Sequence, residues 1–211
     1  MIQVSQKYLD LTRQKLELVR LPQAPRNASR TLDVGVSKEN LEPVIDHWLE
    51  AYNWRKQEDF YNDSLPQFRV PINGTRLHFV HKRSRVPTAV PLLFVHGVPE
   101  SFIAVSKMVD MLSNPLSSPS HGRQSTPRLH NRLAAKKFTG DSMTAFHVVA
   151  PSIPGMGFSD PVSEQSNNIQ STCDIFDALM KGLGYNQYII HGSGWCVAIE
   201  TMCIPQPDWT G

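Results

Sequence analysis

The sequence predicts an α/β protein in which a helical N-terminal region precedes a sheet with parallel strands. Short apolar runs in the second half of the chain alternate with segments of helical periodicity, at a spacing typical of parallel strand–helix–strand units. The first quarter instead places apolar residues at helical spacing among charged ones. Between the two regions the pattern changes to alternation around Asn73-Gly74, which favours a β-hairpin.

Two segments of the N-terminal region are predicted to be helical. Residues 5–20 distribute leucines among charged residues, as an amphipathic helix does. Residues 36–64 form the clearest helical region, because Ser37 is a good N-cap and apolar residues then recur at i, i+3, i+4 spacing from Leu41 to Tyr52. The aromatic residues of this region are expected to pack in a core rather than to bind a cofactor.

Three apolar runs predict the parallel part of the sheet. They are AVPLLFVHGVP, AFHVVAP and YNQYIIHG, and their continuous apolar character is typical of strands covered on both faces. Residues 101–112 and 169–182 lie between them and have helical patterns. Because the carboxyl ends of parallel strands meet at one edge of a sheet, the loops after these strands should bring Val98, Gly155 and Gly194 together.

Residues 113–143 do not follow this alternation. The segment is rich in serine, proline and basic residues and poor in apolar ones. A loop of this length is unusual inside a compact domain and indicates a disordered insertion, so no packed element is expected over 117–142. Its basic cluster is interpreted as a solvated loop rather than an interaction patch.

The composition argues against several classes of protein. The chain has 211 residues, 40% of them hydrophobic and 19% charged, with a formal net charge of +2, so no nucleic-acid partner is expected. No stretch approaches the roughly 18 apolar residues that span a bilayer, and the N-terminus lacks the apolar part of a secretory signal. We therefore expect a cytoplasmic protein without a membrane anchor. Its three cysteines are too few for a disulfide framework and are expected to be reduced.

Four segments together resemble the epoxide hydrolases of the microsomal type. LLFVHGVPES, FHVVAPSIPGMGFSD and LGYNQYIIHGSGW are similar to the core of that family and occur in the family's order. Residues 1–85 resemble its N-terminal extension, so residues 86–211 would be a partial hydrolase core. The similarity is greatest to fungal members without a membrane anchor. The resemblance implies a helical extension plus the first half of an α/β-hydrolase parallel sheet.

The resemblance also implies an activity, the hydrolysis of a lipophilic epoxide to a vicinal diol in a biosynthetic or detoxifying pathway. In this family an aspartate attacks an epoxide carbon and forms an ester, which water splits with the help of a histidine. The reaction requires no metal and no cofactor. The sequence ends soon after the segment that matches the nucleophile, and none of its eight histidines matches the family's base, which indicates a truncated chain.

The H-G-x-P motif of the family is present as His96-Gly97-Val98-Pro99. The resemblance implies that the backbone N–H groups of Val98 and Trp195 would stabilise the oxyanion that forms when water splits the ester. It also implies that His96, Gly97 and Pro99 shape this loop. A role for His96 as the catalytic base is the disfavoured alternative.

The nucleophile position departs from the family. The G-x-D-W-G motif aligns on residues 192–196, so Gly194 stands where the family has aspartate and no catalytic side chain is intact. Ser193 is a poor substitute, because the sharp turn of a nucleophile elbow needs small residues two positions away and both of these are bulky. Cys196 has small neighbours at those positions, but its use would require the elbow to shift by two residues.

Three hypotheses therefore remain open. The chain is an epoxide hydrolase by lineage whose sequence is truncated or imperfect, a non-catalytic remnant that binds an apolar ligand or a full-length relative, or a thiol hydrolase that uses Cys196. Ligand binding without turnover would favour the second hypothesis, and thiol-dependent turnover the third. Nothing in the sequence predicts an oligomeric state.

Overall fold

The computed structural model describes residues 1–21, 36–115, 144–162 and 169–192. The chain divides into two compact units, one formed by Ile2–Phe60 and the other by Met1 together with the residues from Tyr61 onward. This division lies upstream of residue 85, where the resemblance places the end of the N-terminal extension. The boundary at residue 85 refers to the family's organisation and stays a prediction.

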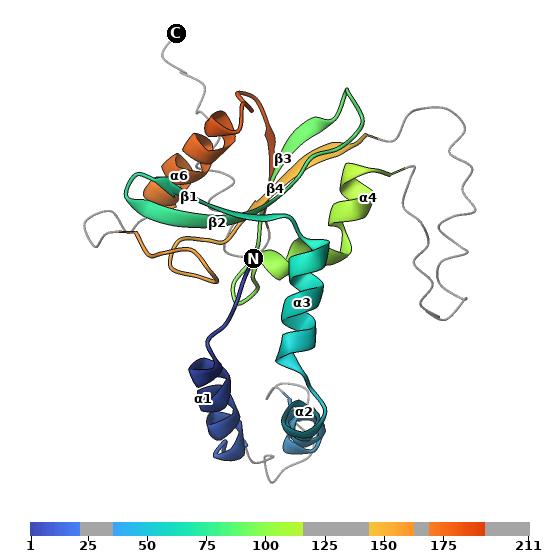
Figure 1. Cartoon of the computed structure of the whole chain (residues 1–211), viewed down its shortest axis with the longest axis vertical. Helices are drawn as coiled ribbons and strands as arrows, with labels where there is room; N and C mark the ends of the chain where they lie inside the picture. The colour runs from blue at the N-terminus through green and yellow to red at the C-terminus, as the bar shows by residue number, and fades with distance from the viewer. Residues whose placement is uncertain (22–35, 116–143, 163–168, 193–211) are drawn as a thin grey trace, which may run out of the picture. The chain divides into compact units, whose positions relative to one another are not determined.

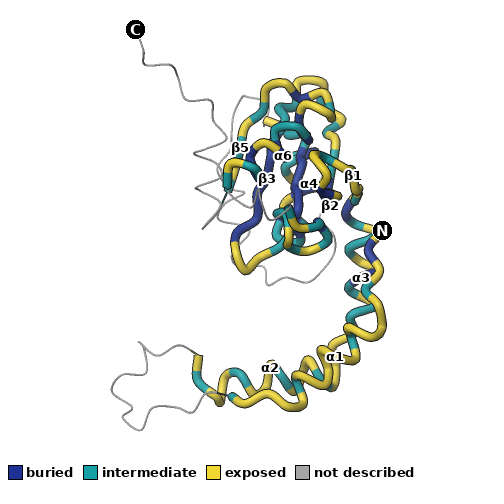
Figure 2. Tube along the Cα trace, turned by 90° about the vertical axis from the view of Figure 1, so that its left-hand side faces the viewer, coloured by how far each residue is buried: buried dark blue, intermediate teal, exposed yellow. Residues whose placement is uncertain are grey.

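Amphipathic helices make up the unit Ile2–Phe60. Helix α1 spans Gln6–Glu17, α2 spans Lys38–Glu50, and α3, which begins in this unit, spans Trp54–Ser64. The helical region is thus interrupted at residues 51–53. Neither α1 nor α2 buries a side chain (Figure 2). Trp48 and Tyr52 are 46% and 39% exposed, so the expectation that these aromatic residues pack in a core is wrong.

Buried Glu58 joins the N-terminal segment to α3. Its Oε1 accepts hydrogen bonds from the Val4 N–H at 2.6 Å and from the Trp54 indole at 3.1 Å, and its Oε2 accepts one from Arg55 at 2.6 Å. Burial raises the pKa of Glu58, but these donors outweigh it and hold the pKa below its ordinary value. Glu58 is therefore a charged and fully partnered carboxylate.

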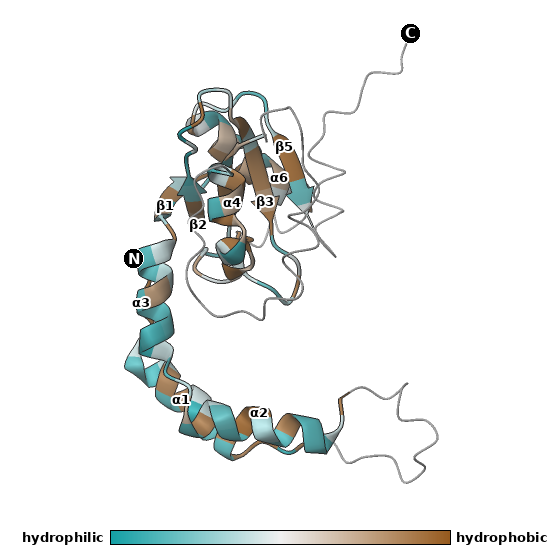
Figure 3. Cartoon of the chain, turned by 90° about the vertical axis from the view of Figure 1, so that its right-hand side faces the viewer, coloured by the Kyte–Doolittle hydropathy of each residue, from teal (hydrophilic) through white to brown (hydrophobic). Residues whose placement is uncertain are grey.

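A five-stranded sheet lies at the centre of the other unit. Its strands are β1 (Gln67–Ile72), β2 (Thr75–Lys82), β3 (Val90–Val95), β4 (Phe146–Pro151) and β5 (Ile189–Gly192). Their order across the sheet is β1-β2-β4-β3-β5. Strand β2 pairs antiparallel with β1 and β4, whereas β3 pairs parallel with β4 and β5. The three apolar runs thus form the parallel part, and β3 at its centre is hydrophobic throughout (Figure 3).

The β1–β2 hairpin turns at the predicted dipeptide. Asn73 and Gly74 have φ angles of 48° and 81°, so both adopt the left-handed region. Two successive left-handed residues make a turn whose twist matches that of the flanking strands, and Asn-Gly is the dipeptide that adopts it most readily. Local sequence therefore fixes the register in which β1 pairs with β2.

Helix α6 (Ile169–Gly182) covers one face of the sheet. The residues that it buries there are Thr172, Cys173, Ile175, Phe176, Leu179 and Met180. Leu93 and Val95 of β3 pack in the same cluster, as expected for alternate residues of one strand. Cys173 is disulfide-bonded, so the expectation of reduced cysteines is wrong for this residue.

The 3₁₀ helix η2 (Phe102–Lys107) and helix α4 (Val109–Ser113) lie on the other face (Figure 1). The helix predicted over 101–112 is thus a 3₁₀ segment followed by a short α-helix. Ser113 is fully buried at the end of α4, although the sequence placed it at the start of the insertion. The remainder of the predicted insertion, residues 116–143, lies outside the described residues. No helix among the residues that the structure describes combines the length and apolar character needed to cross a membrane.

Replacing Glu58 with alanine should destabilise the N-terminal unit by about 2–4 kcal/mol, because the Val4 N–H and the Arg55 guanidinium lose a buried acceptor. Glu58→Gln should have a smaller effect, since its amide oxygen keeps one acceptor, while the charge is lost and the second acceptor becomes an NH₂ donor. Urea unfolding followed by the fluorescence of Trp48 and Trp54 measures both. An alanine variant with an unchanged midpoint would contradict this role for Glu58.

Candidate active site

The loops that follow β3, β4 and β5 leave the sheet at the same edge, because these strands are parallel. Gly192 at the end of β5 pairs with Val95 of β3, the residue before His96. The H-G-x-P loop therefore begins at the level where the chain leaves β5. Ser193, Gly194, Trp195 and Cys196 lie outside the described residues, so the predicted approach of Gly194 to Val98 stays a prediction.

His96 links the loop after β3 to the loop after β4. Its Nδ1 lies 2.9 Å from the carbonyl oxygen of Gly97, and its Nε2 accepts a hydrogen bond from the Ile153 N–H at 3.2 Å. Because a carbonyl oxygen only accepts and an N–H only donates, Nδ1 carries the proton and Nε2 does not. The ring is 1% exposed, and its burial lowers the pKa more than the Gly97 contact and the nearby Glu100 raise it. His96 is thus a neutral, buried side chain whose two nitrogens bind the backbone.

The backbone after His96 presents an available donor. Val98 is 56% exposed, and within the described residues no hydrogen bond uses its N–H. Gly97 by contrast is buried, and its N–H donates to Glu100 Oε2 at 3.3 Å. The Val98–Pro99 peptide bond is cis. A backbone N–H that is not used within the described residues, in the loop after a strand, is the kind of group that binds an anion or a developing oxyanion.

The loop after β4 folds tightly against β2. Gly155 and Gly157 have φ angles of 79° and 55°, which a residue with a side chain adopts only with strain. A Cβ atom on Gly157 would lie 2.9 Å from the Ser152 Oγ. Glycine at position 157 therefore permits both the backbone conformation and the close approach to Ser152.

Asp160 fastens the far end of this loop to the β1–β2 hairpin. Its carboxylate accepts hydrogen bonds from Arg69 at 3.0 Å and from Arg76 at 2.7 Å. The Asp160 N–H also donates to the Arg76 carbonyl oxygen, and the Asp160 carbonyl accepts from the Gly155 N–H. The hydrogen bond from Arg76 and the charges of both arginines lower the pKa of Asp160. Asp160 orders the loop, and both of its carboxylate oxygens accept hydrogen bonds from arginines of the hairpin.

A buried polar network lies beneath the same loop. His78 Nδ1 is 2.9 Å from the Ser152 Oγ, and its Nε2 is 3.0 Å from the Gln67 Oε1. The Gln67 Nε2 donates to the Tyr61 carbonyl, so Oε1 faces His78 and the proton of the imidazole sits on Nε2. Ser159 accepts from the His78 N–H at 2.9 Å and donates to the Ser152 carbonyl at 2.8 Å.

Aromatic rings enclose the imidazole of His78. The ring centroid of Phe102 lies 4.7 Å from that of His78, and the ring centroid of Phe158 lies 5.5 Å from it, both in edge-to-face arrangements. Burial, with a contribution from the charge of Arg69, lowers the pKa of His78 to about 4. His78 is therefore a neutral structural group. Although it is paired with a serine, Ser152 is fully buried and has no access to a substrate.

Sequence reasoning missed this network and the two arginines that hold Asp160. The only local signal for His78 is its place in an alternating strand, which does not distinguish a buried ring from an exposed one. Among the described residues no group of three or more histidine, cysteine or acidic side chains could hold a metal ion. Within the described region, the site thus offers an anchored loop with a backbone donor rather than a side-chain nucleophile.

Comparison with known proteins identifies the family that this arrangement resembles. The family model described as "Epoxide hydrolase N terminus" matches residues 1–105. Epoxide hydrolase 1 of Oryctolagus cuniculus is 31% identical over 204 residues, covering 95% of this chain and 40% of that protein. Juvenile hormone epoxide hydrolase 1 of Ctenocephalides felis is 30% identical over 166 residues, covering 77% of this chain and 31% of that protein. The chain spans about two fifths or less of the length of these relatives.

Solved structures show the same fold. Aspergillus niger epoxide hydrolase superimposes with a TM-score of 0.71 and 25% identity, covering 95% of this chain and 46% of that chain. The juvenile hormone epoxide hydrolase of the silkworm Bombyx mori superimposes with a TM-score of 0.71 and 26% identity, covering 96% and 47%. The predicted α/β-hydrolase fold is confirmed, and with it the resemblance on which the site residues were selected.

His96→Leu should lower the free energy of unfolding by about 2–4 kcal/mol, because it leaves the Ile153 N–H and the Gly97 carbonyl without their buried partner. His96→Gln can replace one of the two hydrogen bonds and should lose less. Chemical denaturation gives both values, and hydrogen exchange at the Ile153 amide reports the lost bond directly. Unchanged protection of that amide in the leucine variant would rule out the proposed link.

His78 should make stability fall as the pH decreases from about 6.5 to about 4. An unfolded histidine takes up a proton in this range, whereas folded His78 stays neutral until its pKa of about 4. The contribution of His78 to the free energy of unfolding is therefore fully present above the pKa of the unfolded histidine. As the pH falls toward the folded pKa, His78 alone lowers the free energy of unfolding by up to about 1.4 kcal/mol per pH unit, about 3 kcal/mol in total.

The matched variants separate this effect from those of other histidines. His78→Gln should make the acid limb of the stability profile shallower, whereas His47→Gln, at an exposed position on α2, should leave it unchanged. The limb should not vanish in His78→Gln, because burial also lowers the pKa of His81 and His147. Equal slopes in the His78 variant and the parent would show that His78 is not the buried neutral group described.

Proposed function

The chain belongs to the epoxide hydrolase family with the α/β-hydrolase fold, and from this premise we propose that it supplies the oxyanion-binding part of a site that hydrolyses a lipophilic epoxide to a vicinal diol. The Val98 N–H, which no hydrogen bond uses within the described residues, is the observation that carries the proposal. His96 supports it, because its hydrogen bonds to Gly97 and Ile153 fix the loop in which Val98 stands.

The role of Val98 follows from the chemistry of the second step. A carboxylate first attacks an epoxide carbon, the carbon–oxygen bond of the ring breaks, and the ring oxygen takes up a proton, which leaves a hydroxyalkyl ester. Water then attacks the carbonyl carbon of the ester, and negative charge develops on the carbonyl oxygen. A backbone donor aimed at that oxygen contributes about 3–4 kcal/mol to such a step. We assign this role to the Val98 N–H, with the Trp195 N–H as the second donor.

Residue 194 determines whether this chain completes the reaction. The proposed alignment puts Gly194 at the position of the nucleophile, and glycine has no carboxylate. Attack on a ring carbon needs a nucleophile held about 3–3.5 Å away, and much of the rate comes from that positioning. The chain as written should therefore not hydrolyse epoxides, while the fold retains the loop that would serve the reaction.

Four finer points are part of the same proposal and rest on the sequence. The N-terminal extension would occupy residues 1–85 and the hydrolase core residues 86–211. The enzyme would act in the cytoplasm and without a cofactor. Its small net charge gives no reason to expect a nucleic-acid partner.

The test compares the parent chain with Gly194→Asp and with Gly194→Asn, which has nearly the same size but no nucleophilic carboxylate. Each is incubated with styrene oxide and analysed by intact mass and peptide mapping. Gly194→Asp should gain the mass of one epoxide on the introduced aspartate, because the ring opens by addition without a leaving group. The parent and Gly194→Asn should gain nothing at this position.

Two outcomes would overturn the proposal. A folded Gly194→Asp variant that forms neither adduct nor diol would show that residue 194 does not stand at a nucleophile elbow. Diol formation by the parent above the uncatalysed rate would show that another group attacks. If Cys196→Ala abolished that activity, the thiol hydrolase would replace the present proposal.

A further inference from the structure

Helix α6 carries a covalent link to another part of the chain. Cys173 is buried and disulfide-bonded. The chain contains three cysteines, so the partner of Cys173 within the chain is Cys196 or Cys203. Both follow Gly192, the last residue of β5, and both lie outside the described residues. The disulfide therefore connects α6 to the part of the chain that carries Gly194, where the proposed alignment puts the nucleophile.

The direction of α6 places Cys173 near the edge of the sheet at which β3 ends. Tyr185, shortly after α6, stacks on His147 near the start of β4, with ring centroids 5.6 Å apart. An α-helix rises about 1.5 Å per residue, so Cys173 lies about 14 Å before Gly182, the last residue of α6. Val95, the last residue of β3, packs in the same buried cluster as Cys173. Cys173 is thus on the α6 face of the sheet, at the level where the parallel strands end.

Strand β5 ends at the same level and on the same face. Gly192 pairs with Val95 across the sheet. Ile190 packs against the cluster that contains Cys173, and residues two apart in a strand share a face, so Gly192 also belongs to the α6 face. The chain therefore leaves β5 close to Cys173.

Chain length separates the two possible partners. A disulfide requires Cα atoms about 4.4–6.8 Å apart. Cys196 is four residues beyond Gly192 and so stays within about 14 Å of it on any path. Cys203 is seven residues further along, and a nucleophile elbow continues into a helix, which would carry Cys203 about 10 Å away from this edge. Cys196 is therefore the partner that the geometry favours.

We propose that Cys173 is bonded to Cys196, and that this disulfide is a redox-sensitive link that holds the segment carrying residue 194 against α6. Cys196 has no thiolate while the bond is intact, so it does not act as a nucleophile in that state. The link does not depend on the epoxide chemistry proposed for the sheet edge, because the two sulfurs bond to each other and neither reacts with a substrate.

Opening the link is a two-electron reduction. A dithiol reductant supplies two electrons and two protons, becomes a disulfide itself, and leaves thiols at Cys173 and Cys196. Cytosolic thiols are kept reduced, whereas oxidising compartments preserve disulfides. The state of the link would therefore follow the redox conditions around the protein, and the thiol hydrolase hypothesis would apply only to the reduced form.

Peptide mapping identifies the partner. The full chain is purified without reductant, its free thiols are blocked with N-ethylmaleimide in urea, and it is digested with trypsin and glutamyl endopeptidase. Cleavage after Lys181 and Glu200 places the three cysteines in separate peptides. We expect one linked pair that contains Cys173 and Cys196, with Cys203 blocked. A pair of Cys173 with Cys203, or three blocked cysteines, would show that the proposal is wrong.

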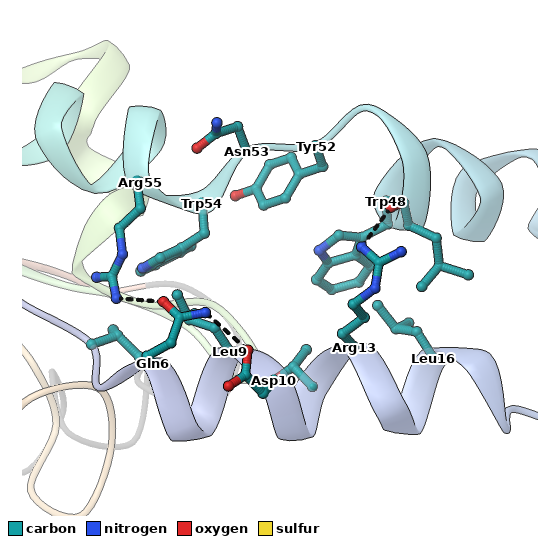
Figure 4. A pocket seen from close by; sticks show the side chains of 13 residues that line it. Gln6, Leu9, Asp10, Arg13, Leu16, Trp48, Tyr52, Asn53, Trp54 and Arg55 are labelled. Atoms are coloured by element: carbon teal, nitrogen blue, oxygen red, sulfur yellow. Dashed lines mark hydrogen bonds between the residues drawn. The ribbon is translucent and has the colours of Figure 1, made fainter.

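Hydrogen exchange measures whether the link constrains α6. Dithiothreitol should accelerate amide exchange in the first two turns of α6 by about tenfold or more in the parent and in Cys203→Ser, because a covalent constraint is lost. Cys196→Ser, which lacks the link, should exchange at the faster rate with or without dithiothreitol. Peptides of α1 and α2 are the internal control, because the unit Ile2–Phe60, whose pocket Figure 4 shows, contains no cysteine. Equal exchange in the oxidised and the reduced parent would contradict a link that constrains this part of the fold.

Discussion

The candidate site depends on one neutral imidazole. His96 donates from one ring nitrogen to the Gly97 carbonyl and accepts at the other from the Ile153 N–H, and so it joins the loop after β3 to the loop after β4. A protonated ring has two donors and no acceptor, and would release Ile153. The burial that lowers the pKa of His96 therefore also preserves the geometry that presents Val98.

Other hydrogen bonds of the same unit hold the loop after β4 at this edge of the sheet. His78 and its serine partners hold the start of the loop after β4, and Asp160 with two arginines of the hairpin holds its end. The loop is thus fixed at both ends, and His96 contacts it at Ile153, next to Ser152. Because Arg69 belongs to β1 and Arg76 and His78 belong to β2, the hairpin that precedes the parallel strands contributes directly to the placement of the site.

Residue spacing and turn dipeptides predicted those parts of the fold that depend on interactions between residues close together in the sequence. The Asn73-Gly74 turn, the three apolar strands and the apolar side of α6 all follow from spacing alone and are present as expected. Features that depend on tertiary partners were missed. The alternation of β2 gave no sign that His78 would be buried and uncharged, and the helical spacing of α2 gave no sign that Trp48 would remain exposed. The motif identified the H-G-x-P loop, but only the structure shows which donor in it is available.

The position of the proton on the His96 ring decides whether His96 can link the two loops, and ¹⁵N NMR of the imidazole rings, assigned with a His96→Gln variant, measures it. We expect a ring that carries its proton on Nδ1, with Nε2 unprotonated, and that titrates below the ordinary pKa of histidine because burial lowers its pKa. A proton on Nε2, or a titration of His96 near the ordinary pKa of about 6.5, would show that His96 is not the neutral link between the two loops.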